Sequence, residues 1–468
     1  MPVIFITDAL IFLLVFVIAM FAWFSSRYEH LCEPWKQVRK SKLAMISAVF
    51  LAFYVVTGLL DSMHFHPALS ADKEGKVIYS SEIESVLDII TDGIRSRTET
   101  TYSAPFAAYG YSREFLTGKD GKIYRGYPRL TYGGAHLTDP DNQRYRDILV
   151  KTVTGFCYGT LAWLIFSVLC IYCVARANKI FFRESANRIL HGQLPTPWKS
   201  VIVTAGILIL MISTIAYLSG FYHVFGTDKV GQDVLYQALK SVRTGLLIGT
   251  LTTLVMLPFA LVLGIMAGYF RGWVDDVIQY LYTTLNSIPG VLLIAASILI
   301  LEVYMNKHAA YFTSVEQRAD MRLLFLCMIL GITNWTGLCR LLRGEALKLR
   351  EVDYVQAAQA FGVSNRVILV RHLLPNVMHI VMISIVIDFS GLVLAEAVLA
   401  YINIGVDPTM SSWGNMINSA RLELAREPVV WWSLSAAFVF MLGLVLPANL
   451  FADAVRDAFD PRMRQVPE

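Results

Sequence analysis

The sequence reads Asp353-Tyr354-Val355-Gln356-Ala357-Ala358-Gln359-Ala360-Phe361-Gly362 and continues, after a short interval, as Arg371-His372-Leu373-Leu374-Pro375-Asn376. This polar and basic region lies between two long apolar segments. One face of the predicted helix carries positions i, i+3, i+4 and i+7, namely Tyr354, Ala357, Ala358 and Phe361. Gly362 can adopt the positive φ that ends a helix, and Pro375 is predicted to open the next span. Two interpretations are open: an ordinary cytoplasmic loop helix, or a short helix shaped to dock into another protein.

The composition is that of a membrane protein. Hydrophobic residues make up 56% of the 468 residues and charged residues 16%, whereas soluble domains carry about 25% charged residues. The apolar runs are about 18 residues or longer, which is enough to cross a bilayer. Because backbone groups in lipid must be paired within their own segment, we predict an all-α polytopic membrane protein. The small net charge of +4 does not indicate nucleic-acid binding.

Nine spans are predicted, near residues 4–24, 43–60, 152–174, 200–219, 246–269, 280–301, 321–341, 376–400 and 431–452. Basic residues cluster in alternate loops, within residues 27–42, 176–188, 340–371 and 456–464. Lysine and arginine are enriched in the cytoplasmic loops of membrane proteins. All four clusters are therefore predicted to be cytoplasmic, which gives an external N-terminus and a cytoplasmic C-terminus.

Residues 61–150 interrupt the membrane pattern and are rich in charge, tyrosine and glycine. Ser81 and Glu84 have the spacing of a capping box, followed by an apolar stripe at helical spacing. Asp120-Gly121 lies between two runs of strand-forming residues, which predicts a β-hairpin. We expect a small external α+β domain. Its tyrosines have two open roles, as a recognition surface or as the core and rim of the domain.

Motifs for catalysis, phosphate binding or metal binding are missing from the sequence. It contains no G-x-x-x-x-G-K-[ST] loop, no H-E-x-x-H and no zinc-type Cys/His cluster. Cys170 and Cys173 form a C-x-x-C within an apolar span, where packing is favoured over a redox or metal pair. We therefore predict no catalytic residues, no metal site and no cofactor in this chain.

The region 345–375 resembles the EAA loop of ABC importer permeases, whose pattern is Glu-Ala-Ala, three residues, Gly, nine residues, Ile, one residue, Leu-Pro. The matching residues are Gln356, Ala357, Ala358, Gly362, Leu374 and Pro375. The chain departs from the pattern at Gln356, where the family has Glu, and at His372, where it has Ile. In this family the loop couples the permease to an ATPase. The resemblance therefore assigns the coupling contact to Asp353, Tyr354, Gln356, Ala357, Ala358, Phe361, Gly362 and Pro375.

Further segments resemble dipeptide and oligopeptide permeases of the DppC/OppC type. One is an extracytoplasmic signature comprising His223, Gly226, Thr227, Asp228, Gly231 and Asp233. The others are residues 267–275, 288–290, 395–397, 412–416 and 456–462. Asp228 and Asp233 are compatible either with helix caps or with a purely structural turn. The matches fall in order over residues 200–468, and the first 199 residues carry much less of the resemblance.

Two carboxylates fall within the eighth predicted span. Asp388 lies near its middle and Glu396 near its outer end, and charges in a span tend to face a bundle interior or an aqueous path. Ser384 lies one helical turn before Asp388. These three residues are our candidates for the translocation path. For Asp388 a buried polar contact between helices remains open beside a role facing a cationic substrate group.

The resemblance implies a type I ABC permease with four regions: N-terminal transmembrane helices (1–60), an inserted extracytoplasmic domain (61–150), a transmembrane helix with a basic loop (151–199) and a permease core (200–468). It implies a bacterial inner-membrane location and four kinds of partner: a second homologous permease, two ABC ATPases, an extracytoplasmic substrate-binding protein and the lipid bilayer. ATP and Mg²⁺ would bind in the ATPases.

Two other functions stay open. One is an ion-coupled secondary transporter, which would require inverted repeats or intramembrane ion ligands. The other is a membrane-anchored sensor or assembly subunit with a degenerate permease core, for which the departures at Gln356 and His372 are the motive.

Overall fold

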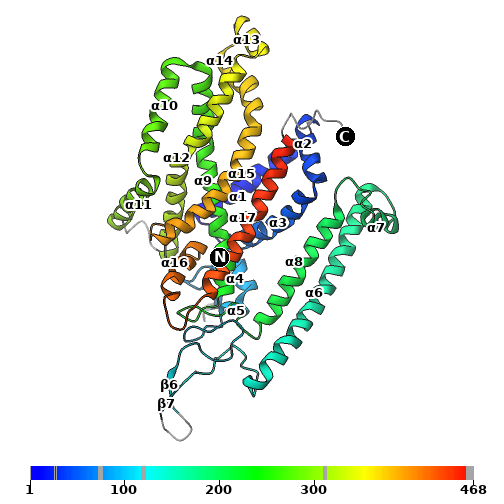
Figure 1. Ribbon diagram of the computed structural model, residues 1–468, viewed down its shortest axis with the longest axis vertical. Coiled ribbons are helices and arrows are strands. Elements are labelled where there is room, and N and C mark those ends of the chain that lie inside the picture. The colour runs from blue at the N-terminus through cyan, green and yellow to red at the C-terminus, as the bar shows by residue number, and fades with distance from the viewer. Residues whose placement is uncertain are drawn as a thin grey trace. The chain divides into compact units, whose positions relative to one another are not determined.

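The computed structural model describes residues 2–25, 27, 29–71, 77–117, 123–308 and 314–459 (Figure 1). The predicted Asp120-Gly121 turn and the tail motif from residue 460 onward lie outside these residues. Contacts divide the chain into two compact units. Unit 1 comprises Met1–Ile4, Lys36–Thr244 and Ser411–Pro447, and unit 2 comprises Phe5–Trp35, Gly245–Met410 and Ala448–Glu468.

Unit 1 contains long apolar helices together with the inserted segment. Its helices are α3 (Lys42–Asp61), α4 (Val86–Ile90), α5 (Asp92–Arg95), α6 (Pro140–Asn178), α7 (Phe182–Leu190), α8 (Trp198–Ser219) and α16 (Trp413–Glu423). Three helices contribute residues to both units: α2 (Glu29–Lys40), α9 (Val234–Phe270) and α17 (Trp432–Phe459).

Small residues bring α6 and α8 close together within unit 1. A Cβ atom at Gly159 would lie 3.1 Å from the Cα of Leu210, so the two backbones approach nearly to contact there. Further along, Trp163 Nε1 donates to the carbonyl of Ile202 at 3.0 Å. Because α6 begins at Pro140, the predicted domain boundary at 150 falls inside this helix.

The described strands of unit 1 lie in the inserted segment, except for β1 at the start of the chain. An antiparallel three-stranded sheet has the order β1 (Pro2–Val3), β2 (His64–Phe65), β5 (Glu84–Ser85), and two hairpins pair β3 (Ala68–Ala71) with β4 (Val77–Tyr79) and β6 (Glu114–Thr117) with β7 (Ile123–Gly126). The hairpin predicted between residues 111 and 127 is therefore confirmed. Of its tyrosines, Tyr102 is buried whereas Tyr124 and Tyr132 are exposed, which places the first in the core of the segment and the other two at its surface.

The predicted capping box is wrong. Glu84 belongs to β5, and the N-cap of the helix is Ser85, four residues after the predicted Ser81. Ser85 Oγ accepts the N–H of Asp88 at 3.1 Å, and Asp88 Oδ2 accepts the N–H of Ser85 at 2.9 Å. Pairing of Glu84 with Phe65 of β2 keeps residue 84 in a strand, and this long-range contact overrides the local signal.

Unit 2 is helical throughout the part that is described. Its helices are α1 (Ile6–Ser25), α10 (Gly272–Ser287), α11 (Gly290–Lys307), α12 (Val315–Arg350), α13 (Asp353–Ala360), α14 (Asn365–Val367), a π-helical turn (Ile368–Leu373) and α15 (Leu374–Tyr401). The single span predicted over 280–301 is wrong, because the helix is interrupted at Ile288-Pro289. Proline has no backbone N–H and favours an extended conformation in the residue before it.

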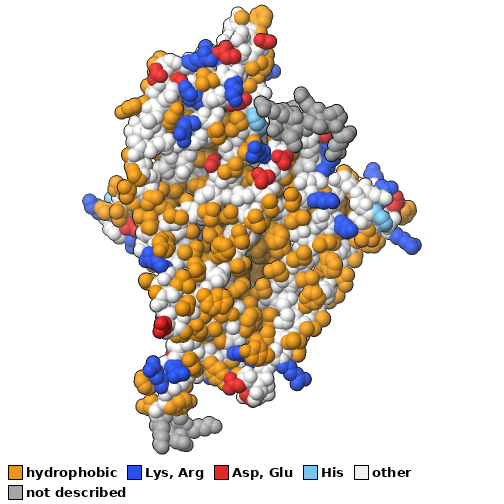
Figure 2. Space-filling view, viewed as in Figure 1, with side chains coloured by type: hydrophobic (Ala, Val, Ile, Leu, Met, Phe, Trp, Pro, Cys, Tyr) orange, Lys and Arg blue, Asp and Glu red, His pale blue; other side chains and the backbone are white. Residues whose placement is uncertain are grey.

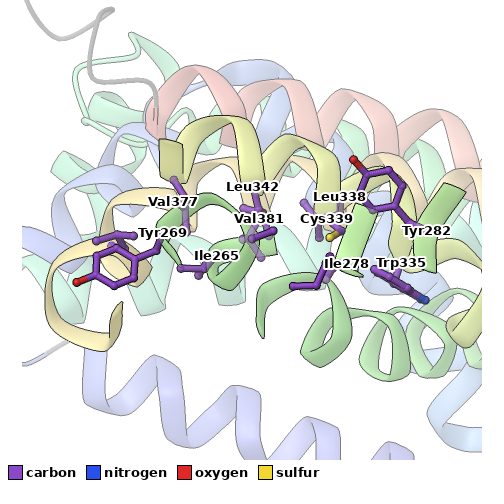
Figure 3. Close-up of a cluster of buried hydrophobic side chains, with 14 of the residues drawn as sticks. Ile265, Tyr269, Ile278, Tyr282, Trp335, Leu338, Cys339, Leu342, Val377 and Val381 are labelled. Atoms are coloured by element: carbon purple, nitrogen blue, oxygen red, sulfur yellow. The ribbon is translucent and has the colours of Figure 1, made fainter. Parts of the chain in front are cut away.

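The core of unit 2 forms where α9 packs against α12. A Cβ atom at Gly268 would lie 2.5 Å from the Cβ of Ala346, and one at Gly264 would lie 2.8 Å from the Cβ of Leu342. Only glycine permits this approach of the two backbones. Around it lies a buried cluster, shown in Figure 3, that includes Ile265, Tyr269, Ile278, Trp335, Leu338, Val377 and Val381.

Among the described residues, eight helices are long and apolar enough to cross a membrane: α3, α6, α8, α9, α11, α12, the continuous helix over residues 365–401, and α17. The apolar part of α1, Ile6–Met20, is shorter. The all-α polytopic fold is thus confirmed, while the count of nine spans stays a prediction.

Candidate functional site

Helix α13 is held against unit 2 by a residue that the sequence pattern did not single out. Val355 is fully buried in the unit 2 core cluster, together with Ile368 of the π-helical turn. Gly362 follows the helix with a φ of +73°, a conformation that glycine adopts without strain. In Figure 1, α13 and α14 lie beyond the ends of α12 and α15. A short helix is therefore anchored on one side and accessible on the other.

The accessible side carries the residues predicted for coupling. Tyr354 is 42% exposed and Phe361 is 87% exposed, while Ala357 is exposed between them. Ala358 is half-buried against the core cluster. An aromatic side chain that is almost fully exposed on a small apolar face is the kind of residue that anchors in a partner's pocket.

Tyr269, at the end of α9, is hydrogen-bonded to α13 and α14. Its hydroxyl donates to Asn365 Oδ1 at 2.9 Å and lies 3.3 Å from Gln359 Nε2, which donates to it. The carbonyl of Tyr269 accepts from Arg350 at 2.8 Å. The end of α9 is thereby joined to α12, to α13 and to α14. Sequence comparison marked residues 267–270 as similar to the family, but the role of this tyrosine emerges only from the packing.

The two departures from the family pattern are accommodated without loss of the local structure. Gln356 is exposed, and its Nε2 donates to the carbonyl of Glu351 at 3.2 Å. The His372 ring lies 6.0 Å from the Tyr354 ring. Asn376 Nδ2 donates both to Tyr354 Oη at 3.0 Å and to the carbonyl of His372 at 2.6 Å. His372 therefore lies beside Tyr354, on the exposed side of α13.

Pro375 is the second residue of α15, but it does not start a separate helix. Residues 365–401 form one continuous helical segment that includes the π-helical turn. A proline at 375 cannot donate to the carbonyl of Arg371, and a local change to the wider π-helical pattern accommodates that loss. Helix α14 is therefore continuous with a candidate membrane span.

A second fixed contact lies between α10 and α12. Arg343 binds Asp275 in a bidentate manner, with Nε–Oδ1 at 2.6 Å and Nη2–Oδ2 at 2.7 Å. Such paired geometry fixes orientation as well as distance. Asp275 belongs to the family-like stretch 272–275, for which the sequence offered no specific role.

The candidates for the translocation path all lie on α15. Ser384, Leu392 and Glu396 are buried, and Asp388 between them is half-buried. These positions follow one another at intervals of four, so they share a helix face. The exposed stripe of the same helix carries Ile387, Leu394 and Val398 instead. Asp388 therefore lies on the face of α15 that packs against the rest of the protein, between the buried residues Ser384 and Leu392.

The extracytoplasmic signature is a buried ionic site within unit 1. His223 Nδ1 lies 2.7 Å from Asp233 Oδ2, and His223 Nε2 lies 3.4 Å from Glu99 Oε1. Burial alone would lower the pKa of His223, but its contacts with the Asp233 and Glu99 carboxylates outweigh burial and raise the pKa to about 9. The imidazole is thus a cation held between two carboxylates.

Glu99 belongs to the inserted segment and ties it to this loop. It accepts the N–H groups of Thr131, Tyr132 and Gly133 at 2.9, 2.8 and 3.1 Å. Burial alone would raise the pKa of Glu99, but its bonds to His223 and to these three N–H groups lower the pKa to about 2. No local motif marks Glu99, because the residues it joins are far apart in the chain.

The glycines and polar residues of the signature make this close approach possible. Gly231 has a φ of +78°, and a Cβ atom there would lie 1.8 Å from the carbonyl oxygen of Glu99. Thr227 Oγ1 accepts the N–H of Ser103 at 2.7 Å. Asp228 closes a turn by accepting from Gln232 N at 2.9 Å, and Asp233 accepts from Leu235 N at 2.8 Å in the first turn of α9. One aspartate therefore stabilises a turn and the other a helix start.

Comparison with known proteins identifies relatives of this chain. The family model described as "Binding-protein-dependent transport system inner membrane component" matches residues 260–465. The chain is 31% identical over 247 residues to the oligopeptide transport system permease protein OppC of Mycobacterium tuberculosis, covering 53% of this chain and 78% of that protein. It is 29% identical over 311 residues to the dipeptide transport system permease protein DppC of Lactococcus lactis, covering 64% of this chain and 83% of the relative. It is 27% identical over 299 residues to the glutathione transport system permease protein GsiD of Pectobacterium atrosepticum, covering 58% and 92% respectively.

Proposed function

This chain belongs to the family of inner-membrane permeases of binding-protein-dependent oligopeptide and dipeptide importers, and we propose that it forms half of a peptide translocation path driven through α13 by separate ATPases. It is a transport subunit and not an enzyme. The single observation that carries the coupling proposal is the contrast on α13, where Val355 is fully buried and Phe361 is 87% exposed. The helix is built into the permease on one side and is left to contact a partner on the other.

The contacts around α13 support a mechanical role. Tyr269 bonds it to the end of α9, and Asn365 continues into the span of α15 without a helix break. A displacement of α13 by an ATPase would therefore move α9 and α15 together. ATP must bind one of the two permease states more tightly to shift the equilibrium between them. In this proposal, closing of the ATPase pair favours the outward-facing state.

The proposed complex has five further components. They are a second homologous permease, two ABC ATPases that bind ATP and Mg²⁺, a substrate-binding protein outside and the surrounding bilayer. The docking of a binding protein would take place on the side that carries the His223 loop and the inserted segment 61–150. The charge distribution favours a bacterial inner membrane orientation in which the α13 side and the C-terminus are cytoplasmic.

The substrate class follows from the relatives, which transport oligopeptides, dipeptides or glutathione by name. A peptide carries a protonated amino terminus. Asp388 supplies a carboxylate on the protein-facing side of α15, and partial exclusion of water strengthens its attraction for that cation. We propose that Asp388, Ser384 and Glu396 contribute to the path for such a substrate.

Uptake by the reconstituted complex tests this function. The chain is reconstituted in proteoliposomes with its homologous permease and ATPases, and a labelled tripeptide is supplied with the binding protein. We expect uptake that requires both ATP hydrolysis and the binding protein. Uptake driven instead by an ion gradient would establish a secondary transporter. Absence of uptake from a complex that hydrolyses ATP would favour the sensor or assembly subunit.

A further inference from the structure

A basic pocket of about 710 Å³ lies within unit 1, outside the residues matched by the family model. It forms where α3 and α8 begin, beside the turn that follows α7. Four of its lining residues are cationic, namely Lys40, Lys42, Arg188 and Lys199, and none is Asp or Glu. The permease mechanism makes no use of this pocket.

The positive charge of the pocket is largely uncompensated. In the parts of the chain that the structure describes, no ion pair involves Lys40, Lys42 or Lys199. Arg188 pairs with Glu184 at 2.6 Å, but both side chains are more than 40% exposed, so this pair is weak. Two helices, α3 and α8, start at the pocket, and two others, α2 and α7, end there, so the helix dipoles offset one another and the positive charge comes from the side chains. An anion is the ligand that this arrangement favours.

The pocket lies at the level where spans meet water. Lys42 and Trp198 are the first residues of α3 and α8, both of which are candidate membrane spans. Tryptophan is enriched at membrane interfaces. Figure 2 shows Lys and Arg side chains gathered where Figure 1 labels α7, next to the hydrophobic surface of α6 and α8.

Three apolar side chains of the pocket lining belong to or lie beside the candidate spans α3 and α8. They are Ile46, Ile189 and Val203, which form an apolar wall, and Val203 is 48% exposed. One turn further along α8, Ile207 is 52% exposed, so the apolar wall continues along the surface of the span. A free phosphate has no apolar surface to bury against such a wall, whereas an acyl chain could pack along it.

We propose that this pocket binds an anionic phospholipid. The phosphate of the headgroup sits among Lys42, Arg188 and Lys199, and the first methylenes of one acyl chain lie against Ile189 and Val203. The orientation predicted from the basic loops would place the lipid in the cytoplasmic leaflet, where anionic headgroups bind basic pockets between helices. The bound lipid would hold the starts of α3 and α8 to the turn after α7.

Lipid binding to the purified full chain tests the proposal. Native mass spectrometry measures the affinity for phosphatidylglycerol and for phosphatidylcholine with the same acyl chains. We expect phosphatidylglycerol to bind tightly and phosphatidylcholine not to. In the triple variant Lys42→Gln, Arg188→Gln, Lys199→Gln, the affinity for phosphatidylglycerol should fall by about tenfold or more, because each cation near the headgroup contributes to binding. Unchanged affinity in this variant would overturn the proposal.

Matched variants separate a site from general attraction. The control triple variant Arg39→Gln, Lys179→Gln, Arg183→Gln removes the same charge from neighbouring residues outside the pocket lining and should retain binding. An equal loss in both would show unspecific electrostatics and overturn the proposal. Val203→Trp keeps every charge but fills the apolar wall, and we expect it to weaken phosphatidylglycerol binding. Displacement of the lipid by millimolar glycerol 3-phosphate would instead identify a site for soluble phosphates.

Discussion

Truncation of Phe361 should weaken ATPase binding without unfolding the permease. The side chain is 87% exposed, so Phe361→Ala removes little from the chain's own packing, and its effect on the chain's stability should stay within about 0.5 kcal/mol. Burial of a phenylalanine side chain in a partner's pocket contributes about 1.5–3 kcal/mol. At about 1.4 kcal/mol per tenfold change, the affinity for the ATPase should fall by roughly 10- to 100-fold.

The assay is the affinity of the detergent-purified permease pair for the ATPase subunit, measured by interferometry together with the melting temperature of the permease. Phe181→Ala is the matched control, because Phe181 is 86% exposed and also belongs to a predicted cytoplasmic region. Wild-type affinity in Phe361→Ala, or an equal loss in Phe181→Ala, would refute the assignment of α13 as the docking helix.

Four further predictions concern the other sites. Gly362→Val should impair coupling, while Gly362→Asn should be tolerated. The φ of Gly362 is +73° and nothing lies within 4 Å of a Cβ atom there, so the two variants should differ only in backbone strain, by about 1–2 kcal/mol. Transport by the two variants decides this. In a cysteine-free background, Glu82→Cys should react with an impermeant reagent in intact cells and Lys179→Cys only after membrane disruption; the reverse pattern would refute the topology. The pKa of His223 is raised, so its stabilising effect is complete below about pH 6.5 and lost as the pH rises through about 9; the melting temperature of the wild type should fall over that range, and that of His223→Gln should fall less. Asp388→Asn should reduce uptake of peptides with a free amino terminus more than uptake of blocked ones, and an equal loss with poor expression would indicate a structural contact.

Local sequence signals were sufficient where the structure depends on short-range chemistry. The period of three and four residues and Gly362 predicted α13 and its end, and the Asp120-Gly121 pair between two runs of strand-forming residues predicted the hairpin of β6 and β7. Long apolar runs predicted most of the spans. In each case the deciding property belongs to the backbone or to a single helix face, so it can be read without knowledge of the neighbours.

The rest depends on contacts between distant residues. An apolar face that docks a partner has the same period as one that packs inward, so the pattern did not reveal that Val355 is the buried anchor. The capping box was misplaced because Glu84 pairs with β2. Glu99 and Tyr269 act only through residues that are brought together by folding, and neither carries a local motif for that role.

The central claim, that α13 receives the force of the ATPases, is tested most directly by photocrosslinking from position 361. A photoreactive phenylalanine analogue replaces Phe361 in the complete complex, and the same analogue at Phe181 serves as the control. We predict that the analogue at 361 crosslinks to the ATP-binding subunit with a yield that changes when ATP is added, whereas the analogue at 181 does not. Crosslinks from 361 only to lipid or to the partner permease, in a complex that transports normally, would contradict the claim.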